Sequence, residues 1–184
     1  MAMTVDVAEL IEELIDREGG FVDHPADRGG ATSWGITERV ARGEGWQGAM
    51  RDLPRGTAAA IYRRRYWEAP GFAAVATRAP NLAAELFDTG VNMGVGVASG
   101  FLQRALNALN RGARDWPDLG IDRRIGPATL AALDAYLASR GRHAEAVLVR
   151  AVDALQGARY VALAEARPDQ EAFLYGWLAN RIGS

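Results

Sequence analysis

Apolar residues recur through most of this chain at spacings of three and four, the period of an amphipathic α-helix. In the first such segment, positions 7, 11, 14 and 15 are apolar, and Glu18 continues the same face. Asp6 followed by Glu9 predicts the start of this helix, and the Gly19-Gly20 pair predicts its end. A carboxylate on the core-facing side is expensive to bury in its ionised form, which suits a general acid. The alternative is that the helix frays at the glycines and leaves Glu18 exposed.

The rest of the chain also has the helical period. Further predicted helices begin at or near Thr37, Thr57, Pro80, Gly96, Pro127, Arg142 and Asp169. The two threonines suit N-caps, and Pro127 suits a first helical position. No segment shows sustained strand alternation, although a small hairpin around residues 21–36 would fit. We therefore expect a mainly α fold, a compact helical bundle with one glycine-rich loop.

Domain organisation follows from the absence of a Ser- or Gly-rich linker. We expect two lobes, residues 1–95 and 96–184, packed into one compact unit. The irregular stretch at 110–126 is interpreted as a connection between helices within that unit.

The composition of the chain limits the kinds of partner and ligand that we expect. The net charge of −2 gives no reason to expect nucleic acid, and the chain has no cysteine for disulfides or thiolate chemistry. His24 lies near Asp23 and Asp27, but the spaced ligands of a metal site are missing, so we expect neither metal nor cofactor. No apolar run approaches the roughly 18 residues of a spanning helix, and the N-terminus lacks the features of a signal peptide.

The loop after the first helix carries polar groups among turn formers. Asp27 and Thr32 lie on either side of Gly29-Gly30, which let the backbone bend sharply or approach a ligand closely. An Asx-turn for Asp27 and a local backbone bond for Thr32 are the structural alternatives.

These residues resemble a known family. Glu18-Gly-Gly-Phe, Asp27-Arg-Gly-Gly-Ala-Thr32 and Gly35-Ile-Thr37 are similar to the N-acetylmuramidases of glycoside hydrolase family 108. Arg28 departs from the family pattern, in which Pro is more usual. Further blocks follow in the family's order, the later ones resembling its C-terminal peptidoglycan-binding region: 65–67, 87–94, 102–107, 121–130 and 167–177.

The resemblance implies a lysozyme-like endolysin that cleaves the β-1,4 bond between N-acetylmuramic acid and N-acetylglucosamine in peptidoglycan. Glycosidases use a protonated carboxyl that donates to the leaving oxygen, and a second carboxylate opposite it. Glu18 is then the acid, and Asp27 stays ionised on its polar loop to position water or stabilise the oxocarbenium ion. Thr32 helps to hold the attacking water. The resemblance favours inversion, and direct attack by Asp27 on the opposite face of the sugar stays open as the alternative.

Three further residues are candidates for binding the glycan strand. Trp34 lies in the loop, where its ring could stack on a sugar, and Phe21 could do the same, although a Phe there is often core. Asn92 precedes a glycine-rich break and could face the cleft, or it could close its helix.

Two rival functions stay open. A lytic transglycosylase also uses one key Glu but forms an anhydro ring, and a non-catalytic protein could bind peptidoglycan as a component of a particle or a secretion accessory. For the hydrolase we expect a monomer made in the bacterial cytoplasm, released through a holin or another system and active on the periplasmic cell wall. A phage or prophage origin fits this route.

Overall fold

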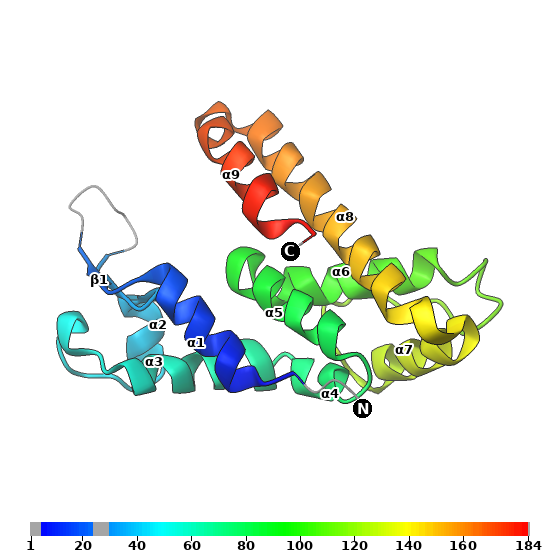
Figure 1. Cartoon of the computed structure of the whole chain (residues 1–184), viewed down its shortest axis with the longest axis horizontal. Helices are drawn as coiled ribbons and strands as arrows, with labels where there is room; N and C mark the ends of the chain where they lie inside the picture. Colours follow the sequence, from blue (N-terminus) through cyan, green and yellow to red (C-terminus); the bar gives the residue numbers. More distant parts are fainter. Residues whose placement is uncertain (1–4, 24–29, 184) are drawn as a thin grey trace. The chain divides into compact units, whose positions relative to one another are not determined.

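The computed structural model describes residues 5–23 and 30–183, most of them helical (Figure 1). The described chain divides into two compact units, one spanning Val5–Ala69 and the other beginning at Pro70. The mainly α fold expected from the sequence is confirmed. The division into lobes at residue 95 stays a prediction.

The first unit combines short helices with a small sheet. Its elements are α1 (Val7–Glu18), β1 (Phe21–Val22), β2 (Thr32–Ser33), β3 (Ile36–Thr37), α2 (Glu38–Gly43), the 3-10 turn η1 (Met50–Asp52), α3 (Arg55–Tyr62) and the π-helical segment η2 (Arg63–Glu68). The Asp6 carboxylate accepts from the N–H of Ala8 at 2.8 Å and caps α1, as predicted. The apolar stripe of α1 is buried at Ile11, Leu14 and Ile15, which anchors the helix in the unit.

The sheet is antiparallel in the order β1-β2-β3. Ser33 pairs with Ile36, so only Trp34 and Gly35 connect β2 to β3. Both connecting residues have positive φ, 54° and 74°, as a type I′ turn requires. The predicted hairpin is therefore confirmed, with a third strand added.

Helix starts in this unit agree only partly with the sequence. The Thr37 hydroxyl accepts from the N–H of Val40 at 3.4 Å, so this predicted cap is confirmed. The predicted cap at Thr57 is wrong, because α3 begins two residues earlier with Pro54 as its N-cap. Proline has a fixed φ of about −65° and no N–H, and both suit a helix start better than a helix interior.

The regular elements of the second unit are all helical in its described part. Its elements are α4 (Phe72–Ala76), α5 (Pro80–Met93), α6 (Val95–Ala108), α7 (Pro127–Arg140), η3 (Gly141–His143), α8 (Ala144–Ala166), η4 (Pro168–Gln170) and α9 (Glu171–Arg181). Helix α5 packs against α4, α6 and α8. Leu82, Leu86, Leu102, Leu106 and Leu148 are completely buried and form the core of this unit.

The long helix α8 buries a stripe that runs through Ala144, Leu148, Val152, Gln156, Tyr160 and Ala164. Successive members of the stripe are four residues apart, so the neighbouring Val147 falls outside it. Val147 is 41% exposed.

The last helix, α9, lies along α8 (Figure 1) and has no buried residue. One aromatic contact joins the two helices: the Trp177 ring stacks on Tyr160 of α8 with centroids 5.0 Å apart. Within α9, Trp177 also stacks on Phe173, with centroids 6.0 Å apart. Trp177 thus packs α9 against one face of α8, while most of the surface of α9 stays exposed.

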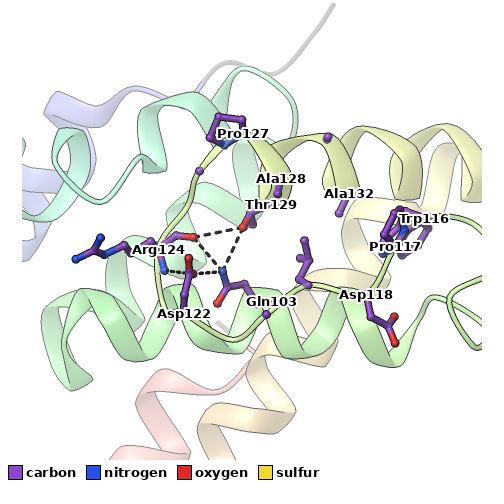
Figure 2. A pocket seen from close by; sticks show the side chains of 14 residues that line it. Gln103, Trp116, Pro117, Asp118, Asp122, Arg124, Pro127, Ala128, Thr129 and Ala132 are labelled. Carbon is purple, nitrogen blue, oxygen red and sulfur yellow. Dashed lines mark hydrogen bonds between the residues drawn. The ribbon is translucent and has the colours of Figure 1, made fainter.

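The irregular stretch between α6 and α7 is held by buried amides of α6. The Gln103 side chain, 2% exposed, donates to Asp122 Oδ1 at 2.7 Å and to the Arg124 carbonyl at 2.9 Å (Figure 2). Its own oxygen accepts from the N–H of Arg123 at 2.9 Å. A pocket of about 530 Å³ lies beside these bonds, walled mainly by apolar side chains that include Trp116 (Figure 2).

Candidate active site

Glu18 is the last residue of α1, and Gly19 turns the chain away with φ of 76°. Its side chain is exposed, so the prediction of a buried carboxylate on the core-facing stripe is wrong. The stripe is buried as far as Ile15, whereas Glu18, one turn later, is the last residue of the helix. The group is therefore open to a substrate from solvent.

The stem of Glu18 is nevertheless tightly confined by the turn between β2 and β3. A Cβ placed on Gly35 would lie 2.8 Å from Glu18 Cγ and 3.0 Å from Glu18 Cβ, and still closer to the Tyr62 hydroxyl. Both distances are below normal van der Waals separation, so only glycine fits at this point of the turn. The turn thus fixes the base of the Glu18 side chain while its carboxylate stays free.

Tyr62 supports the same turn from α3. Its ring is 2% exposed, and its hydroxyl donates to the Trp34 carbonyl at 3.1 Å. Burial, and then the negative charge of Glu18, raise the pKa of Tyr62 far above its usual range. The phenol therefore stays neutral, and it remains a hydrogen-bond donor beside Glu18 at any pH the protein meets.

Trp34 occupies the first position of the turn and is held by its own side chain. The indole N–H donates to the Leu53 carbonyl at 2.8 Å, and the Arg55 guanidinium lies 5.7 Å from the ring centre. Arg55 is in turn held by Glu12, with Nε to Oε2 at 2.8 Å. These contacts account for a non-glycine residue at positive φ, a conformation that surrounding structure must maintain. Stacking of this half-buried ring on a sugar stays a prediction.

The other predicted residues of this unit lie on the sheet. The half-buried Thr32 hydroxyl is 3.5 Å from the Gly30 carbonyl, a long hydrogen bond that leaves it available for other partners. Phe21 on β1 is 40% exposed, with the Arg51 guanidinium 5.7 Å from its ring centre. The partner carboxylate Asp27, together with His24 and Arg28, lies outside the described residues.

Asn92 belongs to α5, in the second unit. Its amide donates to the Asp88 carbonyl at 2.8 Å and to Asp88 Oδ2 at 3.0 Å, one helical turn earlier. These hydrogen bonds lie within α5, so they agree with the alternative in which Asn92 stabilises its own helix. A role in binding substrate stays a prediction.

Sequence reasoning missed Gly35 and Tyr62 as parts of the site. The sequence contained an indication of the role of Gly35. An aromatic residue followed by glycine, between two short segments that each pair a polar with an apolar residue, is compatible with a two-residue hairpin turn. Tyr62 had none, since its bond to Trp34 joins positions 28 residues apart and follows only from the tertiary fold.

No group of three or more His, Cys, Asp or Glu side chains that could hold a metal ion occurs within residues 5–23 and 30–183. In the same part of the chain, no helix is long and apolar enough to cross a membrane.

Comparison with known proteins divides the chain in two. Residues 11–94 match the model of the glycosyl hydrolase 108 family, and residues 97–182 match that of a predicted peptidoglycan domain. No protein of curated function matches.

Among solved structures, the chain is similar to that titled "Structure of Brucella abortus SagA". The TM-score is 0.66 at 23% identity, over 94% of this chain and 87% of that one, which shows a shared fold. The N-terminal half of the chain thus belongs to the glycosyl hydrolase 108 family and the C-terminal half to the predicted peptidoglycan domain family, so the protein is a glycoside hydrolase that degrades peptidoglycan.

Proposed function

We propose that this protein is an N-acetylmuramidase that hydrolyses the β-1,4 bond between N-acetylmuramic acid and N-acetylglucosamine, with Glu18 as the general acid. The observation that carries the proposal is the placement of Glu18: its carboxylate is exposed at the end of α1, and its stem lies against Gly35. A general acid must reach the leaving oxygen and must also be held in one position. The exposed carboxylate and the confined stem of Glu18 support this role.

Asp27 and Thr32 complete the proposed reaction. Glu18 donates its proton to the glycosidic oxygen as the bond to the departing sugar breaks. The ionised Asp27 activates a water on the opposite face of the sugar, and the Thr32 hydroxyl orients that water. This is an inverting reaction, for which the two carboxyl groups stand about 6.5–9.5 Å apart, compared with about 5–5.5 Å in retaining enzymes.

The test is product analysis on purified peptidoglycan. Wild type, Glu18→Gln and the control Glu13→Gln, an exposed acid on the same helix, are compared by mass spectrometry of borohydride-reduced products. We expect reducible N-acetylmuramic acid ends from wild type and the control and none from Glu18→Gln. Anhydro-muramic ends from wild type would instead show a lytic transglycosylase and leave Asp27 without its role. Wild-type activity in Glu18→Gln would overturn the assignment of the acid.

A further inference from the structure

A second pocket of the C-terminal unit differs in chemistry from the one in Figure 2. It has a volume of about 340 Å³ and lies where α8 meets α9 and the end of α5. Its polar side chains are Arg159, Arg167, Arg181, Asn92 and Gln170, and Trp177 forms an aromatic wall. Most of the polar groups beside the first pocket form hydrogen bonds that hold the connection between α6 and α7. Three arginines line the second pocket instead.

The charges in this second pocket are poorly balanced. No Asp or Glu lines it, and within the described residues neither Arg159 nor Arg167 forms an ion pair. Arg181 Nη1 lies 3.6 Å from Asp88 Oδ1, and this enclosed nitrogen has no hydrogen bond to any described residue. Burying an N–H donor without a hydrogen bond is costly, so the site favours a ligand that supplies an acceptor.

Two buried acids of the same unit add little negative charge. Glu85 of α5 and Asp153 of α8 lie close to each other, and burial raises the pKa of both, that of Glu85 to about 8. At neutral pH the pair therefore carries less negative charge than two ordinary surface carboxylates. The arginines therefore make the electrostatic potential at the opening of the second pocket positive.

Trp177 gives the pocket a firm side. Its ring stacks on Tyr160 and on Phe173, so it is held in one orientation. An apolar wall beside arginine side chains can accommodate a short peptide, with methyl groups against the wall and carboxylates on the arginines. The volume of the pocket is at the lower end of the range for small-molecule sites, which suits one or two residues.

We propose that this pocket binds the carboxylates of the peptidoglycan stem peptide, an inference that rests on peptidoglycan being the substrate. The sugar backbone of peptidoglycan is neutral, whereas its stem peptides carry free carboxylates. Guanidinium groups bind carboxylates through two parallel hydrogen bonds, and this geometry gives selectivity as well as affinity. The C-terminal unit therefore recognises the peptide, and the glycan is left to the N-terminal unit.

The experiment is a calorimetric titration of the full chain with N-acetylmuramoyl-L-alanyl-D-glutamate, and with the same compound carrying amides in place of its carboxylates. The variants are Arg159→Gln with Arg167→Gln, and the control is Arg150→Gln, an exposed arginine of α8 outside the pocket. Thermal melts establish that each variant is folded. We expect the double variant to bind the acid at least tenfold more weakly than wild type, the control to bind like wild type, and the amide to bind wild type weakly.

Several results would overturn the inference: no binding of the acid to wild type, equal binding of acid and amide, or an unchanged affinity in the double variant. Tighter binding of a phosphate polymer such as teichoic acid than of the acid would assign the pocket to another ligand. Cleavage of glycan strands stripped of peptides separates this inference from the proposed function. If the protein binds the peptide but cuts no glycan, only the proposed muramidase activity is refuted. If it cuts glycan without binding the peptide, only the proposed peptide site is refuted.

Discussion

Gly35→Ala tests the link between the β2–β3 turn and the proposed acid. The substitution adds two costs. An L-residue at φ of 74° costs roughly 1–2 kcal/mol. The new Cβ would also lie 2.8 Å from Glu18 Cγ, and forcing an extra methyl into a packed place costs typically about 1–3 kcal/mol. We expect the free energy of unfolding to fall by about 2–5 kcal/mol in total.

The same contact predicts a loss of activity. The backbone of the turn and the stem of Glu18 cannot both stay in place, and a displacement of about 1 Å at a catalytic group can cost roughly 100-fold in rate. Urea unfolding and the release of reducing ends from peptidoglycan measure the two effects at a temperature where the variant is folded.

Gly45→Ala is the matched control, because Gly45 has φ of 93° but no atom within 4 Å of an added Cβ. It should lose only the backbone contribution and keep its activity. If Gly35→Ala were as stable and as active as Gly45→Ala, the argument that the turn positions Glu18 would be refuted.

Three further predictions concern single side chains. Tyr62→Phe removes the donor to the Trp34 carbonyl. We expect the free energy of unfolding to fall by about 1 kcal/mol and kcat to fall with KM little changed. Unchanged kinetics would limit Tyr62 to a packing role. Gln103→Leu leaves several polar groups of the connection between α6 and α7 without partners. We expect the free energy of unfolding, measured by chemical denaturation, to fall by roughly 2–4 kcal/mol. A loss below about 1 kcal/mol would contradict the anchoring role of Gln103. Burial raises the pKa of Glu85 from its usual 4.5 to about 8, so the folded state holds a proton that the unfolded chain releases, and stability is full below about pH 4.5 and falls as the pH rises toward 8. Glu85→Gln should flatten this decline in Tm between pH 5 and 8, whereas the exposed control Glu165→Gln should keep it.

The sequence was sufficient to predict the helical class and several element ends, because these depend on local rules. Asp6 and Thr37 cap their helices, and Pro80 and Pro127 occupy first positions. The failure at Thr57 has a local cause too, since Pro54 competes for the same helix start. Local signals thus decide where helices begin when only one candidate is present.

The surroundings of Glu18 could not be predicted in this way. Periodicity placed Glu18 correctly on the face of Ile11 and Ile15, but it carried no information about how far the covering structure extends. The contacts with Gly35 and Tyr62 join segments far apart in the sequence, and only the folded chain brings them together. The catalytic role of Glu18, like those of Asp27 and Thr32, is a proposal that awaits the product analysis.

The π-helical segment Arg63–Glu68 also bears on how this protein can change in evolution. Tyr62 and Trp67 are both buried although they lie five residues apart. In an α-helix that spacing separates two side chains by about 140° around the axis, whereas the wider π turn brings them to the same side. A relative with one residue fewer here could present the same pair from an ordinary α-helix, at a spacing of four. Length differences within helices are usually damaging, but at this segment a single-residue gap would leave the core unchanged.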